Sequence, residues 1–500
     1  MCGCSHSDAC NRSICRKDNQ KRVLVSRNSK ASKDRCRNYS NFPYNTTVGS
    51  FYVENFGCRA TQADGAAIER QLTDRGMSRA GTAAEAEVVV LNTCTVTSSA
   101  DQDARAAIRR IHRANPLVRI LVTGCYAQRA PQEIAALDGV SLVVGNSHKH
   151  RLAEIAAASG FVSLSSLSTP LASSEAPSAA DHRAPIVVED IFAHTELLAA
   201  PVFDSDNEKT RPNLKVQDGC NNRCSFCVIP FVRGRSRSLP LDEVLQNVEQ
   251  LVANGYQELV LSGINLGRWG RDLRDVRRLR FVDLLQAILE RTSVPLLRIS
   301  SVEPMDWSDD LIALVASTQR IASHAHLPLQ SGSDRILRLM HRRYRPWHYE
   351  DRVQRIHAAM PTAAIGADVM VGFPGESEED FEQTRAFIER LPFTYLHVFT
   401  YSSRPGTPSA QMAGQVPVRQ ARERNRVLRE LAARKKRAFQ EQFVGGTLRA
   451  ITLTQFSNGR TEALTDNYQK LWLTGQLPAN RMLTARIRSI EGEALVGDAE

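Results

Sequence analysis

Strand-like segments that alternate with helix-like segments constrain the fold of residues 211–400 most strongly. Six short apolar runs recur there, and segments with apolar residues every three to four positions separate them. The runs are residues 214–216, 259–261, 296–299, 325–329, 367–371 and 395–399. Six such units predict an open or partial (βα)6 barrel whose chemistry lies at the C-terminal ends of the strands.

The helix-like segments carry their own start signals. They are residues 241–255, 281–292, 308–318 and 376–391, with Ser308 and Ser377 placed to cap two of them. A basic helix is expected at 417–441. The last segment, 442–497, alternates as a small β unit does.

Residues 51–158 show the pattern of a second, parallel α/β sheet. Apolar runs at 51–56, 88–91, 120–122 and 142–144 read as buried strands with helices between them. The predicted organisation is therefore a disordered extension at 1–47, a flavodoxin- or Rossmann-like domain at 48–158, a Ser/Ala/Pro linker at 159–208, the barrel domain at 209–441 and a small β-barrel at 442–500.

Composition excludes several classes of protein. Hydrophobic residues make up 42% and charged residues 24%, which is ordinary for a globular chain. No apolar run approaches the roughly 18 residues of a membrane span, and the basic N-terminus lacks the apolar core of a signal peptide. We therefore expect a cytoplasmic protein without a membrane partner. Its net charge of +10 suits a polyanionic partner.

The eleven cysteines are clustered, and none follows Cys227. Disulfide staples are spread more evenly, so in a reducing compartment this clustering indicates metal or iron–sulfur ligation. Five of them, at positions 2, 4, 10, 15 and 36, lie in the predicted extension. Their spacing matches no ligand pattern, so we expect no metal site in the extension. Two alternatives stay open: these cysteines bind a metal, or the extension results from a start codon assigned too far upstream.

Cys220, Cys224 and Cys227 form the most informative motif. They are separated by three and then two residues, directly after a predicted strand. Three thiolates on one tight loop can hold three irons of a cubane 4Fe–4S cluster and leave the fourth iron open. Structural zinc needs four ligands, and the nearest histidine downstream of this loop is His324. A zinc site completed by such a remote histidine stays open as an alternative.

Cys58, Cys94 and Cys125 form a second set, although they lie far apart in the sequence. Each follows a predicted strand, in YVENFGC, VVVLNTC and ILVTGC. Loops after parallel strands meet along one edge of such a sheet, so these thiolates are expected to converge on one site.

The loop CNNRCSFC resembles that of the radical-SAM superfamily, with Phe226 in the aromatic place. The resemblance implies that the open iron binds S-adenosylmethionine, and that Phe226 packs beside its adenine. Ser262, Gly263, Glu303, Gln330 and Asp368 end or follow strands of the predicted barrel and are candidate contacts of this cofactor or of the substrate. GFPGE, at 372–376, is too short for a phosphate loop.

Residues 50–497 resemble the radical-SAM methylthiotransferases. The similarity is carried by NFGCRATQADG, LNTCTVT, VTGCYAQ, VQDGCNNRCSFCVIPFVRGRSRS, LSGINLG, HLPLQSGSDRILRLMHRRY, DVMVGFPGE and HVFTYSSRPGTPSA. It implies a second 4Fe–4S cluster on Cys58, Cys94 and Cys125 that binds or donates the inserted sulfur. It also implies two molecules of S-adenosylmethionine, one for the methyl group and one for the radical.

Within that family, CNNRCSFC, RGRSRSLP and LTDNY are most similar to the branch that acts on N6-threonylcarbamoyladenosine beside the anticodon of tRNA. The isopentenyladenosine branch ranks second and the branch that modifies a ribosomal-protein aspartate third. An iron–sulfur RNA-binding sensor without enzymatic activity is the alternative from another class, and the loop of three cysteines disfavours it.

Basic segments indicate how tRNA is held. Lys and Arg neutralise phosphates without reading sequence. The candidate RNA contacts are Arg342, Arg343, Arg434, Lys435 and Lys436. The terminal β unit resembles the TRAM domain, a small RNA-binding barrel, in which Tyr468 or Trp472 would either stack on a base or pack in the core.

No conventional acid–base pair is expected beyond the clusters. The C2–H bond of adenine has negligible acidity, so a side chain of ordinary pKa does not remove that proton. A radical route also needs an electron donor, expected to be of the flavodoxin or ferredoxin type, and a sulfur source that the sequence does not identify. The enzyme is expected to act as a monomer.

Overall fold

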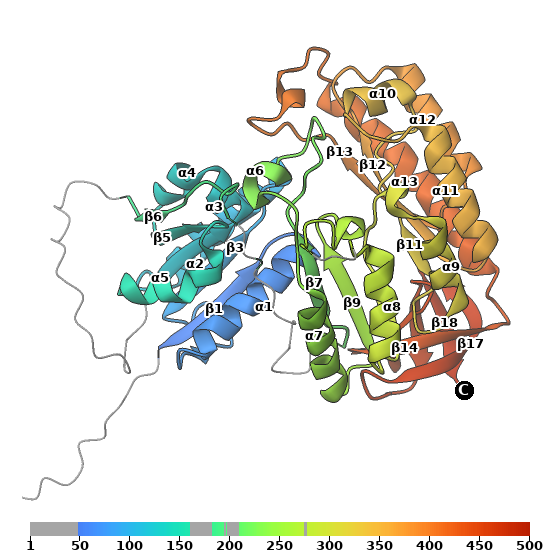
Figure 1. Ribbon diagram of the computed structural model, residues 1–500, viewed down its shortest axis with the longest axis horizontal. Helices are drawn as coiled ribbons and strands as arrows, with labels where there is room; N and C mark the ends of the chain where they lie inside the picture. The colour runs from blue at the N-terminus through green and yellow to red at the C-terminus, as the bar shows by residue number, and fades with distance from the viewer. Residues whose placement is uncertain (1–48, 161–182, 195–196, 198–209, 275–277) are drawn as a thin grey trace, which may run out of the picture. The chain divides into compact units, whose positions relative to one another are not determined.

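A computed structural model describes residues 49–160, 183–194, 197, 210–274 and 278–500. The predicted disordered extension, with its five cysteines, and most of the predicted linker lie outside the described residues. Figure 1 shows the arrangement of the elements.

The N-terminal sheet has six parallel strands in the order β2-β1-β3-β4-β5-β6. The strands are β1 (Ser50–Asn55), β2 (Ser78–Arg79), β3 (Val88–Thr93), β4 (Arg119–Gly124), β5 (Val140–Gly145) and β6 (Ile186–Val187). All four predicted strands are confirmed. The strand order reverses between β1 and β3, and in such flavodoxin-like sheets ligands bind outside the carboxyl ends of the strands at this point.

Helices cover this sheet because apolar residues recur at helical spacing on one face of each. They are α1 (Arg59–Thr73), α2 (Ser98–Ala114), α3 (Cys125–Arg129), α4 (Pro131–Ala135), η1 (Lys149–Arg151) and α5 (Leu152–Ala158). Two apolar clusters, one on each side of the sheet strands, form the core. The edge strand β6 falls inside the predicted linker, so that short stretch belongs to the sheet and the linker prediction is wrong there.

The six predicted barrel strands are all present. They are β7 (Asn213–Asp218), β9 (Glu258–Gly263), β10 (Leu296–Ile299), β11 (His324–His326), β12 (Ala364–Val371) and β13 (Tyr395–Thr400). The pairs β7–β9, β9–β10, β11–β12 and β12–β13 are parallel, and a parallel bridge between Leu297 and Ile321 connects β10 to the segment before β11. In the described part of the chain β13 and β7 are not paired, so the barrel is open.

Most of the helices pack on the outer side of these strands and bury one continuous apolar core with them. The helices of this region are α6 (Ile229–Arg233), α7 (Leu241–Ala253), α8 (Phe281–Arg291), α9 (Asp309–Ser317), α10 (Asp334–Leu339), α11 (Pro346–Ala359), α12 (Glu378–Arg390) and α13 (Val418–Glu441), with short turns η2 (Leu266–Arg268), η3 (Pro304–Asp306) and η4 (Pro408–Gln411). The short strand β8 (Arg237–Ser238) pairs antiparallel with β7.

One of the two predicted helix caps is confirmed. Ser377 accepts a hydrogen bond from the backbone N–H of Asp380 and so caps α12. Ser308 stands at the N-cap position of α9, but its hydroxyl donates to the Asp310 carboxylate and makes no cap hydrogen bond.

The C-terminal segment is a closed five-stranded barrel in the order β14-β15-β16-β18-β17. Its strands are β14 (Thr447–Ser457), β15 (Arg460–Thr465), β16 (Lys470–Thr474), β17 (Met482–Glu491) and β18 (Ala494–Ala499). Arg298 of β10 joins it to the larger barrel. This buried guanidinium pairs with Glu258 and donates to the carbonyl oxygens of Thr465 and Asp466. The predicted small β-barrel is confirmed.

In the described residues no helix is both long enough and apolar enough to span a membrane.

Candidate iron–sulfur sites

Cys220, Cys224 and Cys227 lie on the loop that follows β7, at the C-terminal edge of the open barrel, and all three are partly exposed. They line a cavity of about 640 Å³, together with Phe192, Phe231, Arg235 and His341. This volume is typical of a site for a small-molecule ligand.

Nitrogen donors surround these sulfur atoms. Arg342 Nη1 lies 3.1 Å from Cys224 Sγ, and Asn265 Nδ2 lies 3.5 Å from Cys220 Sγ. The backbone N–H of Asn222 also donates to Cys220 Sγ, at 3.4 Å. N–H groups directed at sulfur stabilise thiolates, as a ligand of iron requires.

Two thiols of this loop, those of Cys220 and Cys227, have raised pKa values and so resist ionisation on their own. Burial, and then the neighbouring Cys224, raises the pKa of Cys227 to about 12. Burial also raises the pKa of Cys220. A bound cation is what holds such closely placed sulfur atoms as thiolates.

Cys58, Cys94 and Cys125 converge on the carboxyl edge of the N-terminal sheet. Cys58 and Cys94 follow β1 and β3, on either side of the point where strand order reverses, and Cys125 follows β4. A Cβ added at Gly57 would lie 2.9 Å from Cys94 Sγ, so the Cys58 loop approaches Cys94 closely. Burial, and then Cys125, raises the pKa of Cys94 to about 12, and Cys58 adds to this effect. The three loops end at one edge of the sheet and the Cys58 loop approaches Cys94, which fits the expected convergence of the three thiols.

The donor atoms at both sets of cysteines fit an iron–sulfur cluster. Each set offers three thiol sulfurs, and N–H groups are directed at Cys220, Cys224 and Cys125. Three thiolates can hold three irons of a cubane cluster and leave the fourth iron open.

Helix α6 connects the two sets of cysteines. It begins two residues after Cys227, and the side chains of Val228 and Val232 pack against Cys125. Asn146, after β5, donates to Val232 O at 2.7 Å and to Cys125 Sγ at 3.5 Å. The loop that carries the first set therefore contributes to the surroundings of the second.

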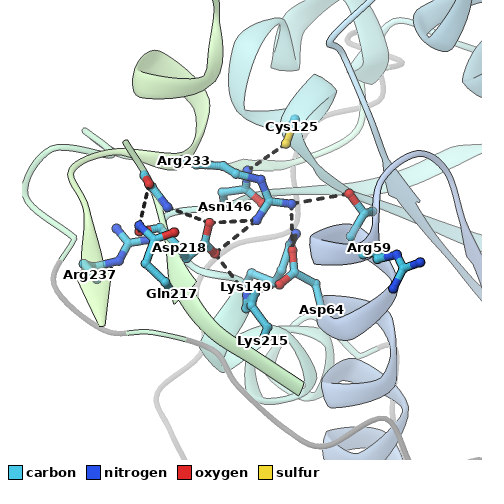
Figure 2. Close-up of polar contacts among 12 residues, drawn as sticks. Arg59, Asp64, Cys125, Asn146, Lys149, Lys215, Gln217, Asp218, Arg233 and Arg237 are labelled. Atoms are coloured by element: carbon cyan, nitrogen blue, oxygen red, sulfur yellow. Dashed lines mark hydrogen bonds and ion pairs between the residues drawn. The ribbon is translucent and has the colours of Figure 1, made fainter. Parts of the chain in front are cut away.

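A buried ion network fixes this contact (Figure 2). The network consists of Asp64, Lys149, Lys215, Asp218 and Arg233. Arg233 Nη2 lies 3.0 Å from Asp64 Oδ2, and Arg233 Nη1 lies 3.0 Å from Asp218 Oδ1. Burial raises the pKa of Asp64, but Lys149, Lys215 and Arg233 outweigh it and hold the pKa at about 2. Asp64 and Lys149 come from the N-terminal sheet domain and the others from the barrel domain, so the network joins the two.

The predicted cofactor contacts lie at the barrel edge, in different surroundings. Ser262 is buried and its hydroxyl has no hydrogen-bond partner, while Gly263 ends β9. Gln330 has a positive φ of 66° and a buried, unpartnered side-chain oxygen. Backbone strain and unpaired polar atoms are features of binding sites.

The other predicted contacts have protein partners. Glu303 accepts from Arg342, and Asp368 Oδ1 lies 3.4 Å from His326 Nε2. Phe226 packs edge-on against Phe373, with ring centroids 6.5 Å apart.

One predicted RNA contact is wrong. Arg342 is buried and directed at Cys224 and Glu303, so it is not available to a phosphate. Arg343 and Arg434 are exposed. Lys435 Nζ donates to Glu389 O, and Lys436 pairs with Glu493.

The two aromatic residues of the small barrel also differ. Tyr468 packs against His324, Tyr395 and Arg298, so it contacts the larger barrel. Trp472 is partly exposed and lies beneath the Lys470 ammonium.

Sequence reasoning missed the residues that surround the sulfur atoms. Asn265 lies in LSGINLG, which carries the family resemblance without giving the asparagine a role, and Asn146 lies outside the segments that carry it. No spacing rule connects either asparagine to a sulfur atom, because Asn265 is 45 positions from Cys220 and Asn146 is 21 positions from Cys125.

Two family models match the chain. Residues 50–145 match an uncharacterized protein family, UPF0004, and residues 214–388 match the radical SAM superfamily. The chain is similar to the radical S-adenosylmethionine methyltransferase TsrM from Kitasatospora setae, with a TM-score of 0.51 and 16% identity, covering 72% of this chain and 76% of that one. This likeness concerns the fold alone.

Curated relatives are much more similar. The threonylcarbamoyladenosine tRNA methylthiotransferases MtaB of Aquifex aeolicus and Bacillus subtilis are 39% and 36% identical, over 83% and 84% of this chain and 94% and 89% of their own lengths. A tRNA-2-methylthio-N(6)-dimethylallyladenosine synthase of Saccharopolyspora erythraea is 36% identical over 74% of this chain and 71% of its own length. The radical SAM match implies a 4Fe–4S cluster and S-adenosylmethionine. The chain belongs to the radical-SAM tRNA methylthiotransferase family.

Proposed function

We propose that this protein converts N6-threonylcarbamoyladenosine beside the anticodon of tRNA to its 2-methylthio derivative. The observation that carries the proposal is the contact, through α6, between two sets of three cysteines. An enzyme that both activates a carbon atom and delivers sulfur needs two such sites close to each other.

Relatives support the choice of nucleoside. The curated relative that is 39% identical over 83% of this chain carries the threonylcarbamoyladenosine name. The dimethylallyladenosine relative is 36% identical over 74%. The isopentenyladenosine substrate is therefore the second candidate.

Each set of cysteines is proposed to hold one 4Fe–4S cluster with one open iron. When bound, the cluster on Cys220, Cys224 and Cys227 would supply the electron that cleaves S-adenosylmethionine, and the other cluster would bind or donate the sulfur that is inserted. Arg342 and Asn265 hold Cys224 and Cys220 in place through N–H···S hydrogen bonds. Asn146 does the same for Cys125.

The polar atoms without partners are proposed to bind S-adenosylmethionine. Ser262 presents such an atom near the end of β9 and Gln330 presents one in the segment after β11, and Gly263 lets a ligand approach the backbone. Phe226 and Glu303 remain candidate contacts at the same edge. Asp368 has a histidine as its neighbour, with which a ribose hydroxyl would compete.

Exposed arginines are proposed to hold the tRNA phosphates, with Arg343 and Arg434 as the best placed. The small barrel, proposed as TRAM-like, is expected to share this task. The cytoplasmic location, the monomeric state and a flavodoxin- or ferredoxin-type electron donor belong to the proposal through the family resemblance.

Mass spectrometry of tRNA nucleosides tests the proposal. In a deletion strain 2-methylthio-N6-threonylcarbamoyladenosine should disappear while 2-methylthio-isopentenyladenosine persists. The wild-type gene and a Cys36→Ala variant should restore the nucleoside, because Cys36 lies outside both sets of cysteines. A Cys224→Ala variant should not. An unchanged nucleoside profile in the deletion strain would overturn the proposal.

A further inference from the structure

Strands β11, β12 and β13 carry three polar side chains close together, of which the proposed function uses only Asp368, as a candidate cofactor contact. In the register of the sheet Asp368 lies opposite His397, and His326 lies opposite Gly366, two residues before Asp368. Because alternate residues of a strand share a face, all three side chains project from the same face. The residues between them, including Ala325, Ala367 and Val398, belong to the apolar core on the other face.

These side chains are close enough to bind one ion. Ligand atoms of His326, Asp368 and His397 all lie within 4.8 Å of one another. Among the described residues they are the one such group of three or more His, Cys, Asp or Glu side chains.

His326 presents a free nitrogen to this group. The residue is 8% exposed, and its Nε2 has no hydrogen-bond partner although it lies 3.4 Å from Asp368 Oδ1. A buried nitrogen without a partner destabilises the folded protein, and a bound ligand would remove that cost.

A second contact orients the imidazole of His326. Its Nδ1 lies 2.9 Å from Ser301 Oγ. Metal-binding histidines generally use one ring nitrogen for such a contact, which fixes the ring and directs the other nitrogen toward the metal.

His324, two residues earlier on the same face, shows the contrast. Its Nε2 lies 2.7 Å from the hydroxyl of Tyr395, and its ring packs on Tyr468 with centroids 4.6 Å apart. This imidazole is held by aromatic neighbours and is not a member of the group.

We propose that His326, Asp368 and His397 bind a divalent cation of the zinc class. Two imidazoles and one carboxylate are ligands that zinc and related transition metals prefer, whereas magnesium and calcium prefer oxygen alone. Three protein ligands leave the fourth position of a tetrahedral ion open to water or to a substrate oxygen. His397 is exposed, so the ion can enter.

Metal analysis of the full-length protein with both clusters assembled tests this site. The protein is incubated anaerobically with excess Zn2+, freed of unbound ions and analysed for zinc and iron together. Wild type should retain about one zinc per chain, because the three ligands form one site. His397→Phe and Asp368→Asn should lose this zinc, with iron unchanged.

A His357→Phe variant is the matched control. His357 lies on α11 and outside the group, so this variant should bind zinc as wild type does. Unchanged iron in every variant shows that the cysteines of both sets still hold their clusters and are not free to bind zinc. The proposal is wrong if wild type retains no zinc, or if His397→Phe and Asp368→Asn retain the wild-type amount.

The zinc count does not depend on the tRNA substrate. Failure of this site and failure of the proposed function are therefore separate results.

Discussion

The two sets of cysteines present similar chemistry through different kinds of structure. Cys220, Cys224 and Cys227 share one loop, so their proximity is local. Cys58, Cys94 and Cys125 come from three loops and meet because three parallel strands end at the same edge. The first set should tolerate damage to the rest of the fold, whereas the second depends on the correct assembly of the sheet.

Their surroundings differ in the same sense. The first set borders a cavity and receives hydrogen bonds from Arg342 and Asn265 of its own barrel. The second has two buried cysteines, and α6 of the other domain packs against one of them. The barrel domain is thus part of the second site. We expect the second set of cysteines to depend on the barrel domain, but the first set not to depend on the N-terminal domain.

Removing one sulfur from each set should separate the two functions, and this is the largest expected effect. Cys224→Ala should abolish both cleavage of S-adenosylmethionine and tRNA modification. Cys94→Ala should abolish modification but retain cleavage, because the first set stays complete. Assays of 5′-deoxyadenosine and of modified tRNA distinguish them. Loss of cleavage in a correctly folded Cys94→Ala protein would contradict the separation.

Arg233→Met should uncouple the domains. Removing one partner from a buried ion network costs about 3–5 kcal/mol, since Asp64 and Asp218 lose a partner in the interior. Urea unfolding should report that loss of stability. Iron analysis should show poorer iron binding by the second set of cysteines. Arg235→Met is the matched control, because Arg235 is exposed. Equal stability of the two variants would refute the structural role of the network.

Acid should weaken the same contact. The pKa of Asp64 is about 2 in the folded protein, and its ordinary value is near 4. A carboxylate whose pKa is lowered by folding stabilises the folded state at every pH above its pKa in the unfolded chain. That stability is lost as the pH falls through the pKa in the folded protein, here about 2–3 kcal/mol between pH 5 and pH 2. Urea midpoints across this range measure it. Asp64→Asn should show a smaller decline than wild type, and identical declines would exclude Asp64 as the source.

Arg342→Gln should affect the first set selectively. Outer partners of metal ligands contribute about 10–100-fold to affinity or activity, and Arg342 directs a nitrogen at Cys224. Cleavage of S-adenosylmethionine should fall by that factor while the second set keeps its iron. Arg343→Gln, an exposed neighbour, serves as the control. Equal rates in the two variants would show that the hydrogen bond to Cys224 is dispensable.

Arg434→Ala should give the smallest effect and leave both sets intact. Loss of one phosphate contact lowers the slope of tRNA affinity against salt by about one. Binding titrations at several salt concentrations measure that slope. Arg426→Ala is the comparison, because Glu423 and Glu430 already neutralise Arg426. A similar slope for both variants would remove Arg434 from the RNA-binding surface.

The strands, and the position of Cys220, Cys224 and Cys227 on one loop after a strand, could be predicted from the sequence because both are local. Apolar runs such as 88–91 reveal buried strands directly, and the spacing from Cys220 to Cys227 needs no tertiary information. Convergence of Cys58, Cys94 and Cys125 was predictable once their strands were assumed to be parallel.

Long-range contacts could not be predicted in this way. Arg342 was expected to face RNA because its neighbours are basic, yet folding buries it against Cys224, 118 positions away. Strand β6 is only two residues long, which is too short for an alternation pattern to reveal it. His326, Asp368 and His397 come from three separate strands, so only the register brings them together.

Iron analysis of the anaerobically assembled protein, with Mössbauer spectroscopy, tests the central claim most directly. Wild type should contain about eight irons in two 4Fe–4S clusters, and alanine replacement of all three cysteines in either set should leave about four. A wild-type protein with about four irons, or with zinc bound at either set of cysteines, would contradict the account.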